Sequence, residues 1–452
     1  MNLLPVNSYY KKVLQVALPA IAGLSTQMVV SLVDSAMVGR LDDATHALAA
    51  MGIGVLATWA LISFFSSLAT GIHVIVARKY GEKDFISCAE TLNNALIISI
   101  VIGIIVAAIG VFFANPIAQL FAANETVGNL ASDYIFYRFL GIPFFLISVS
   151  YRGFFFGISK PKIFMFSGAI TNFLNIIFNY LLIYGAFGFP RMGLAGAGLG
   201  STLATLSDGL FYLIIILLPH YRKRYQNFKH FKLNKNIISA IVKISLPVSF
   251  QNVFILIGFL SFVGITGLIG TVDQAATQAI ISTLFISFLP CFGFGIATQT
   301  LVGNNLGAGK FKLAKIYGFE TAKVATFYTI IIGIIFIIIP QYVLLIITNN
   351  YKIIEVAEPA LRIAGFAQIF YGVGVVLANA LQAAGRMTYV MKAEVITNLF
   401  ILVPLAYFLG VYLGLGLTWA WVALPVYIIS YSTANFLKFK SDNWFTKIPI
   451  DK

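Results

Sequence analysis

Long apolar segments alternate with short polar ones along the whole chain. Each apolar segment holds at least about 20 mostly hydrophobic residues, the length that an α-helix needs to cross the hydrocarbon core of a bilayer. The pattern therefore predicts an all-α polytopic membrane protein with twelve transmembrane helices. We expect them at residues 13–39, 46–77, 88–115, 127–157, 161–187, 194–218, 239–269, 275–305, 313–347, 355–384, 389–412 and 415–437.

The composition supports a membrane protein rather than a soluble one. Hydrophobic residues make up 59% of the 452 residues, charged residues make up 10%, and the mean hydropathy is +0.91. Soluble globular proteins hold about 25% charged residues. The first residues, MNLLPVNSYYKK, lack a short apolar region followed by a small-residue cleavage site, so the first segment is expected to remain as a span. We expect a multi-pass protein of the plasma (cytoplasmic) membrane.

The formal net charge of +14 is explained by the positions of the basic residues. With the N-terminus inside the cell, 24 of the 30 Lys and Arg residues fall at cytoplasmic ends of the expected spans and four fall outside. Arg138 and Arg152 lie within the fourth span. This asymmetry is the positive-inside pattern, which predicts that both termini are cytoplasmic. It also removes the reason to expect a nucleic-acid partner.

The twelve segments form two sets of six that resemble each other. Similar stretches recur 226 to 228 residues apart: VARKYGEKD and VGNNLGAGK, AITN and VITN, and the Leu-Pro pairs that open the first and seventh spans. Gly157 and Gly385 form a further pair at the ends of the fourth and tenth spans. An even number of spans in each set keeps both repeats in one orientation, related by a pseudo-two-fold axis along the membrane normal. Such paired bundles open alternately to either side, which favours a transporter.

This repeat predicts the domain organisation. We expect a six-helix N-terminal lobe at 1–218, a cytoplasmic linker at 219–238, a six-helix C-terminal lobe at 239–437 and a cytoplasmic tail at 438–452. The linker is rich in basic and aromatic residues. It is expected either to be solvated or to contact anionic lipid headgroups.

The first span carries one carboxylate, Asp34, and a proline, Pro19, fifteen residues earlier. A carboxylate inside a membrane is costly unless it has a function or a partner. Because burial disfavours its charged form, Asp34 can take up a proton at one face and release it when water or a cationic substrate arrives. Pro19 removes a backbone hydrogen bond and favours a bend. We interpret Asp34 as an ion-coupling residue and Pro19 as a hinge; the alternative for Asp34 is a structural hydrogen bond without turnover.

Four stretches together resemble the MATE (multidrug and toxic compound extrusion) family. They are VDSAMVGRL at 33–41, YRFLGIPFFLISVSYRGFFFGISKPK at 137–162, NIIFNYLLIYG at 175–185 and GLAGAGLGST at 193–202. The resemblance runs over essentially the whole chain. It implies a secondary antiporter that exports amphipathic, often cationic, organic compounds, with a functional aspartate in the first helix. The alternative is a flippase for a lipid-linked saccharide or another lipid from the same superfamily. A flippase for a lipid-linked saccharide would need cations such as Arg138 and Arg152 to hold a pyrophosphate.

The resemblance also implies where the coupling site lies. Sodium-coupled NorM-like members carry a glutamate in the seventh helix and an aspartate in the tenth, where this chain has Ile255 and Tyr371. Both cation ligands are absent, which resembles the DinF-like branch, whose N-terminal lobe carries the coupling. That branch pairs an asparagine with an aspartate in the fifth helix. Here the pair is Asn175 and Asn179, so the second acidic ligand for a sodium ion is missing. We therefore expect H⁺ as the coupling ion, with Na⁺ as the alternative.

Polar residues on two other helices are expected to complete the site around Asp34. Asn175 and Asn179, four apart, share one helix face. Ser201 and Thr202 fall near a threonine of the family in the sixth span. The alternatives are that the asparagines only join helices and that the hydroxyls bond to their own helix.

Four further residues are candidates for a function, and each has an alternative interpretation. Asp208 is a second acid inside a span, expected either to pair with a basic group near the cytoplasmic face or to be a second protonatable group. Tyr137, Phe154 and Tyr371 are expected to line a substrate cavity through cation–π contacts, with core or lipid packing as the alternative.

The remaining motifs argue against an enzyme. Gly196 and Gly200 form a GxxxG, which predicts close helix packing; a nucleotide-binding GxGxxG fails because position 201 is serine. The sequence lacks a GxxxxGK[ST] motif for ATP and an HExxH motif, and no His has a metal partner at ligand spacing. We therefore expect no metal and no cofactor besides the coupling ion. The expected protein is a monomer in the lipid bilayer that transports a small organic molecule.

Overall fold

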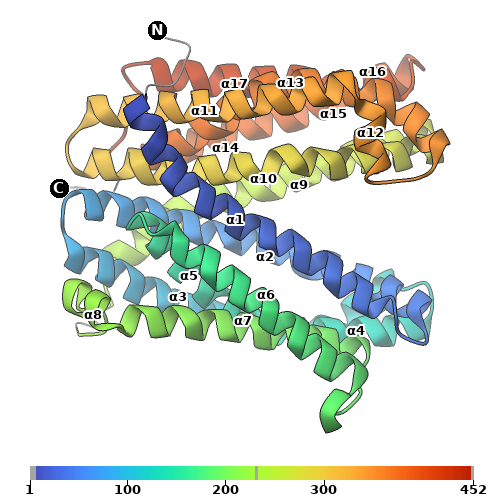
Figure 1. Cartoon of the computed structure of the whole chain (residues 1–452), viewed down its shortest axis with the longest axis horizontal. Helices are drawn as coiled ribbons and strands as arrows, with labels where there is room; N and C mark the ends of the chain where they lie inside the picture. Colours follow the sequence, from blue (N-terminus) through green and yellow to red (C-terminus); the bar gives the residue numbers. More distant parts are fainter. Residues whose placement is uncertain (1–6, 230–232, 449–452) are drawn as a thin grey trace. The chain divides into compact units, whose positions relative to one another are not determined.

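The computed structural model describes residues 7–229 and 233–448, and every secondary-structure element in these ranges is helical (Figure 1). The all-α prediction is confirmed. The α-helices are α1 (Asn7–Val38), α2 (Ala44–Gly81), α3 (Phe85–Phe121), α4 (Glu125–Leu140), α5 (Ile142–Gly157), α6 (Pro161–Tyr184), α7 (Leu194–Leu217), α8 (Pro219–Tyr225), α9 (Lys235–Ile269), α10 (Thr271–Gly307), α11 (Phe311–Ile338), α12 (Pro340–Leu345), α13 (Tyr351–Ala383), α14 (Met387–Thr397), α15 (Val403–Tyr407), α16 (Leu417–Trp421) and α17 (Ala423–Lys440). Shorter elements are the 3-10 turn η1 (Ala186–Gly188) and the π-helical stretches η2 (Asn398–Leu402) and η3 (Phe408–Tyr412).

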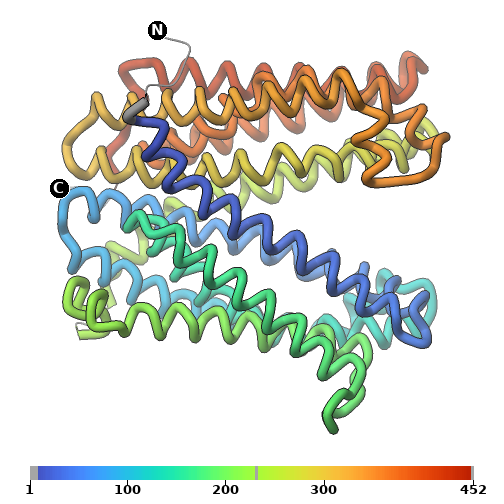
Figure 2. The backbone as a smooth tube through the Cα atoms, in the orientation of Figure 1, coloured from blue at the N-terminus to red at the C-terminus, as the bar shows by residue number. Residues whose placement is uncertain are grey.

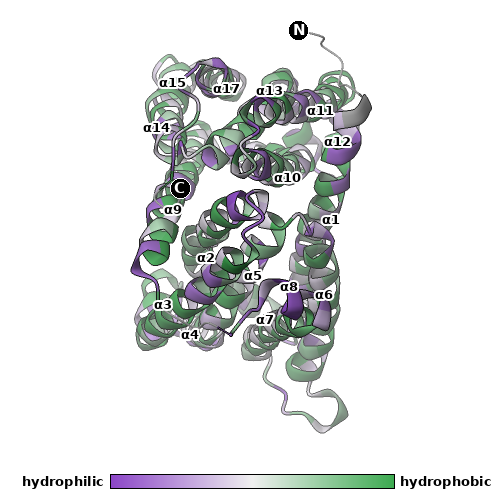
Figure 3. Cartoon of the chain, turned by 90° about the vertical axis from the view of Figure 1, so that its left-hand side faces the viewer, coloured by the Kyte–Doolittle hydropathy of each residue, from purple (hydrophilic) through white to green (hydrophobic). Residues whose placement is uncertain are grey.

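Within the described ranges, eleven continuous helical segments are long and apolar enough to cross a membrane. Helices α4 and α5 pass the same test as a bent pair, which brings the number to the predicted twelve. Hydrophilic residues gather at helix ends and connections, for example along α8 (Figure 3). Helix α2 continues through Arg78 and Lys79 beyond its apolar segment, since basic side chains stabilise the last turn of a helix.

The fourth predicted span, 127–157, is bent by 44° where α4 meets α5 at Gly141. Pro143 has no N–H to donate to the preceding turn, and the N–H of Gly141 bonds three residues back instead of four. The carbonyl of Tyr137 therefore loses its usual helical partner. The hydroxyl of Thr202 on α7 donates to this carbonyl at 2.6 Å instead.

The chain forms two compact units. One is Ala22–Ser249, and the other combines the described residues up to Ile21 with those from Phe250 onward. The boundaries fall inside α1 and α9, in each case two residues after the proline of that helix, Pro19 or Pro247. The first part of α1 therefore belongs to the unit that the second repeat mainly forms, and the first part of α9 belongs to the unit that the first repeat mainly forms.

Each unit has its own helix packing (Figure 2). In the Ala22–Ser249 unit, α2 packs on α3, α4 and α5, and α7 packs on α4 and α6. In the other unit, α13 is central and packs on α10, α11 and α17. Helices α6 and α7 in the first unit and α17 in the second contribute side chains to the polar clusters described below.

Equivalent contacts join the first part of α1 and the first part of α9 to the units to which they belong. In one unit, Ser67 of α2 and Ser249 of α9 share a hydrogen bond of 2.5 Å. In the other, a Cβ at Gly293 of α10 would lie 3.1 Å from the backbone N of Ile21 in α1. Ser67 and Gly293 are 226 residues apart, and Ile21 and Ser249 are 228 apart, so the same pair of positions meets in both repeats.

The turns that follow equivalent helices also share one construction. Lys83 after α2 and Gly309 after α10, 226 residues apart, have left-handed φ angles of 61° and 70°. In both turns this residue's N–H bonds three residues back and the next N–H bonds five back, as in a Schellman motif. Ser159 and Gly385 form a second such pair. Gly385 therefore corresponds to Ser159 and not, as predicted, to Gly157, whose Cβ would lie 2.6 Å from a side-chain atom of α2.

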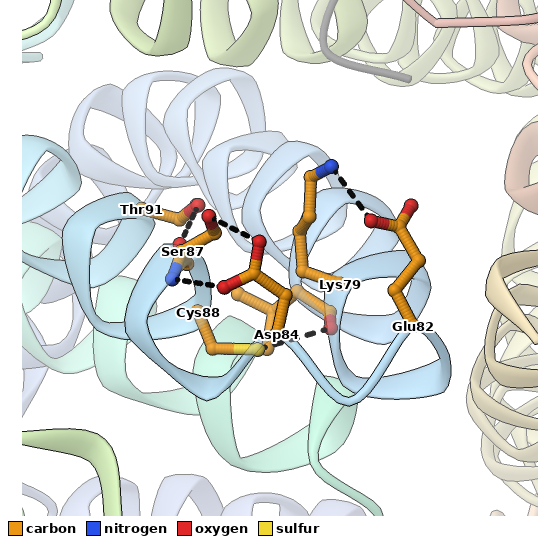
Figure 4. Close-up of polar contacts among 7 residues, drawn as sticks. Lys79, Glu82, Asp84, Ser87, Cys88 and Thr91 are labelled. Carbon is orange, nitrogen blue, oxygen red and sulfur yellow. Dashed lines mark hydrogen bonds and ion pairs between the residues drawn. The ribbon is translucent and has the colours of Figure 1, made fainter. Parts of the chain in front are cut away.

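Most charged side chains in the turn between α2 and α3 interact with other groups of the same turn (Figure 4). The Asp84 carboxylate accepts hydrogen bonds from the backbone N–H of Ser87 at 3.0 Å and from its hydroxyl at 2.7 Å, which caps α3. Lys79 pairs with Glu82 at 2.9 Å. These acids have a structural function in the turn.

The predicted linker at 219–238 contains the short helix α8. Tyr225 of this helix is buried and packs edge-on against Phe154 at 5.4 Å between ring centroids. The linker is thus anchored to the helices before it and is not a freely solvated loop. Linker residues 230–232 and tail residues 449–452 lie outside the described residues.

Candidate functional site

Asp34 lies in the second half of α1 and is half-buried. Its Oδ1 accepts a hydrogen bond of 2.7 Å from Nδ2 of Asn179 on α6. Nearby, the Tyr184 hydroxyl of α6 donates to the carbonyl of Met37 at 2.7 Å. The carboxylate therefore faces a polar partner on a neighbouring helix, along a stretch where α1 and α6 are joined.

A chain of hydrogen bonds leads from Asp34 through α6 to α7. Asn179 Nδ2 also donates to Asn175 Oδ1 at 3.3 Å, and Asn175 Nδ2 donates to Ser201 Oγ at 3.4 Å. Asn179 and Asn175 are 0% and 4% exposed. Oδ1 of Asn179 has no hydrogen-bond partner among the described residues. The structure thus brings Asp34 together with three of the four polar residues predicted around it.

The GxxxG motif of α7 lets this helix approach α6 closely. A Cβ at Gly196 would lie 2.6 Å from the carbonyl of Leu182, and a Cβ at Gly200 would overlap Oδ1 of Asn179. The predicted packing function is confirmed. Gly200 has the further effect of leaving room for the Asn179 side chain.

Arg138 of α4 lies close enough to Asp34 to interact with its charge, and Tyr134, one turn earlier, lies near both. The Nε of Arg138 is buried without a hydrogen-bond partner in the described part of the chain. When Asp34 is ionised, the guanidinium offsets its negative charge. When Asp34 is protonated, the positive charge of Arg138 loses this compensation.

Thr202, the fourth predicted polar residue, is not bonded to the Asp34 cluster. Its hydroxyl donates a hydrogen bond to the carbonyl of Tyr137 at the break between α4 and α5. The position next to Ser201 therefore supports the bent span that carries Arg138.

Replacing Thr202 by Val is expected to lower stability by about 1–2 kcal/mol, because the Tyr137 carbonyl would lose its donor at the break. Thr205→Val is the matched control, since the Thr205 hydroxyl bonds within its own helix, to the Ser201 carbonyl at 2.8 Å. Thermal unfolding of the purified full-length variants measures the difference. Equal losses in both variants would contradict a special function of Thr202.

Asp208 belongs to a separate cluster. The hydroxyls of Ser167 and Thr171 on α6 both donate to its Oδ1, the second at 3.2 Å. Tyr212 lies close to both Asp208 and Arg152. Within the described residues Asp208 makes no ion pair, and its hydrogen-bond partners are neutral hydroxyls rather than a basic group, the first of the two predicted alternatives; that it is a second protonatable group stays a prediction.

The three aromatic residues predicted to line a cavity are dispersed over three helices. Tyr137 is half-buried on α4, and Phe154 is fully buried on α5 among other rings. Tyr371 on α13 lies against Phe288 at 4.6 Å and belongs to the other unit. A substrate cavity lined by them stays a prediction.

Sequence reasoning missed two buried acids within predicted spans, Glu320 and Glu394. Glu394 on α14 is 2% exposed and lies inside a predicted span, so the argument applied to Asp34 identifies it equally well. Within the described residues, no group of three or more His, Cys, Asp and Glu side chains is arranged to hold a metal ion.

A sequence model of the MatE family matches residues 19–181 and 247–408, one range in each repeat and together more than half of the chain. The chain belongs to the MATE family. Both matches begin at a helix proline, Pro19 or Pro247, so the family match reproduces the internal repeat. As a MATE protein the chain is a membrane transporter and not an enzyme.

Curated relatives match this MATE chain over nearly its whole length. "Probable multidrug resistance protein NorM" of Thermotoga maritima is 26% identical over 445 residues, covering 96% of this chain and 93% of the relative. "Multidrug export protein MepA" of Staphylococcus haemolyticus is 24% identical over 445 residues, covering 95% of each.

A solved structure shows the same fold. It is titled as the outward-facing conformation of a multidrug resistance MATE family transporter of the MOP superfamily. It matches with a TM-score of 0.87 at 18% identity and covers 95% of both chains. The predicted twelve-helix fold of two six-helix lobes is confirmed.

Proposed function

We propose that this MATE transporter is a secondary active antiporter that exports amphipathic, often cationic, organic compounds in exchange for protons, coupled through Asp34. The observation that carries the proposal is the hydrogen bond from Asn179 to Asp34, which holds an ionisable carboxylate against a neutral amide inside a membrane-length helix. Ionisable residues in such positions mark ion pathways. The names of the relatives, multidrug resistance and multidrug export, support the substrate class.

The polar groups around Asp34 favour H⁺ over Na⁺ as the coupling ion. Asn179 turns the donor end of its amide toward the carboxylate. Hard metal cations bind within shells of oxygen ligands, and this donor would have to turn away to admit one. A proton needs a single carboxylate oxygen. Na⁺ is the alternative ion.

The proposed cycle depends on competition for one charge. Ionised Asp34 attracts a cationic substrate; a proton from outside neutralises Asp34 and leaves Arg138 uncompensated, which weakens the attraction. Helix α1 then bends near Pro19, and the substrate leaves outward. Proton and substrate must exclude each other, since a ligand shifts an equilibrium only by its differential affinity for the two states.

The proposal includes a place in the cell and in the family. The positive-inside pattern supports a plasma-membrane protein with both termini in the cytoplasm. The residues Ile255 and Tyr371, where sodium-coupled members have acids, support the DinF-like branch. We propose that the protein acts as a monomer.

A flippase for a lipid-linked saccharide is the second candidate. It is favoured by Arg138 and Arg152, whose buried Nε atoms have no partner among the described residues and suit an anionic ligand. Asp34 offsets the charge of Arg138, and the rings of Phe145 and Phe164 lie within 5.8 Å of the Arg152 guanidinium. This arrangement leaves less net positive charge for a pyrophosphate, so we rank the antiporter first.

Transport by purified full-length protein in liposomes tests the proposal. With the membrane potential clamped, we expect an acid-inside pH gradient to drive accumulation of ethidium, because protons leaving the liposome exchange for the cation. A gradient of Na⁺ at uniform pH is expected to drive little. Protein-free liposomes are the control. Ethidium accumulation driven by the Na⁺ gradient alone would identify Na⁺ as the coupling ion. No accumulation in either gradient would contradict cation antiport.

A further inference from the structure

Glu394 is a buried acid that the proposed cycle does not use. It lies on α14 within the span Met387–Tyr412 and belongs to the unit that begins at Phe250. Only 2% of the residue is exposed. A carboxylate in this position needs either a counter-charge, a bound cation or a proton.

The partners of Glu394 are all neutral. The Tyr427 hydroxyl donates to Oε1 at 2.5 Å, and Asn398 Nδ2 donates to the same atom at 3.4 Å. Tyr431, one turn along α17 from Tyr427, also interacts with the carboxylate. Within the described residues Glu394 makes no ion pair. A counter-charge is therefore not what stabilises it.

A chain of amide donors points at this carboxylate. Gln299 Nε2 donates to Gln382 at 3.4 Å, Gln382 Nε2 donates to Gln251 at 3.2 Å, and Gln251 Nε2 donates to the Tyr431 hydroxyl at 3.5 Å. All three glutamines are buried. Aligned donors stabilise the ionised form of an acid, whereas burial stabilises the neutral form. The two effects therefore act in opposite directions on the protonation of Glu394.

Within residues 7–229 and 233–448, the side chains that interact with Glu394 carry no positive charge. Helix α17 presents Tyr427 and Tyr431, and α13 presents Tyr371. Helix α9 contributes the neutral Gln251. On α14 itself Lys392 is exposed, and Lys438 of α17 lies over the ring of Tyr389 at 5.5 Å.

Asn398 can serve either protonation state of Glu394. Its Nδ2 donates to the carboxylate, while its Oδ1 is buried without a partner among the described residues. Rotation of the amide by half a turn would offer Oδ1 as an acceptor to a protonated carboxyl group. Asn398 also opens the π-helical stretch η2, and π-helical turns within α-helices are frequent at functional sites.

We infer that Glu394 is a second proton-binding group, in the unit that does not contain Asp34, and that it exchanges its proton during the transport cycle. The first half of this inference stands on the geometry of the cluster. The second half rests on the proposed function. The two halves are therefore tested separately.

Infrared spectroscopy of purified full-length protein without substrate tests proton binding. The carbonyl stretch of a buried carboxylic acid should appear on acidification of the Asp34→Asn variant, and it should be lost in the Asp34→Asn, Glu394→Gln double variant. Identical difference spectra for the two variants would overturn the inference.

A second variant keeps the test decisive if Glu394→Gln does not fold. Tyr427→Phe removes the 2.5 Å donor but leaves the acid in place. Loss of a hydrogen bond to the charged form should move the appearance of the band by about one pH unit toward higher pH. A band at unchanged pH would show that it does not arise from Glu394, and would overturn the assignment.

Proton release on substrate binding tests the second half. In weakly buffered solution, Glu394→Gln is expected to release one proton fewer per bound ethidium than the unmodified protein. An unchanged number would overturn participation in the cycle. If the unmodified protein releases no proton on binding ethidium while the infrared band persists, the proposed antiport fails and proton binding by Glu394 stands.

Discussion

Asp34→Asn is expected to reduce proton-driven ethidium accumulation in liposomes by about 100-fold, near the upper end of the range for a coupling free energy between two ligands. Asparagine keeps the size of the side chain and an oxygen that can accept from Asn179 Nδ2, so the contact between α1 and α6 is preserved. It cannot change its charge. The unmodified protein should bind ethidium more weakly as pH falls, because protons compete for Asp34, and the variant should lose the part of this pH dependence that comes from Asp34.

The matched control is Asp208→Asn, which removes another acid of the same unit. Asp208 is bonded to hydroxyls of α6 and lies outside the chain of hydrogen bonds that joins Asp34, Asn179 and Asn175. The rate of ethidium accumulation by the Asp208→Asn variant should stay within a few-fold of that of the unmodified protein. An Asp34→Asn variant that exports as well as the unmodified protein would refute the coupling function.

Gly200→Ala is expected to lower stability by about 1–3 kcal/mol, the cost of forcing an extra methyl group into a packed interior. The new Cβ would overlap Asn179 Oδ1 and lie 3.1 Å from the backbone N of Asn179. The Asn179 side chain must therefore shift and lose its geometry toward Asp34. Both thermal stability and proton-driven transport should fall, and each is measured on the purified full-length protein.

Gly209→Ala on the same helix provides the comparison. A Cβ at Gly209 would meet Ile147 and Ser148 at 3.7 Å, an ordinary van der Waals distance. Since alanine is the better helix former by about 1 kcal/mol, this variant should be as stable as the unmodified protein or more so. Equal effects of the two substitutions would show that the approach of α7 to Asn179 has no special importance.

Much of the fold follows from the sequence because the bilayer imposes a simple constraint. Every backbone polar group in the hydrocarbon region needs an internal partner, so long apolar segments become helices. The same reasoning identified Asp34, since an acid stands out in an apolar segment. Asn175 and Asn179 followed from the family resemblance and from their spacing on one helix face.

The features that the sequence did not reveal depend on contacts between distant segments. The partner of Thr202 is a carbonyl on another helix, freed by a break that the apolar pattern of residues 127–157 does not show. The buried setting of Glu394 is formed by Tyr427 and by residues of other helices. Tyr225 was assigned to a polar linker because its neighbours are basic, yet its ring is buried.

The division of α1 and α9 beside Pro19 and Pro247 has a consequence for biogenesis. The ribosome makes the segment 7–21 before the helices with which it forms a compact unit, which come from Phe250 onward. This segment therefore cannot complete its native packing until the second repeat has been synthesised. Chains that stop before the second repeat would leave this segment without its native neighbours, so the two repeats depend on each other for folding.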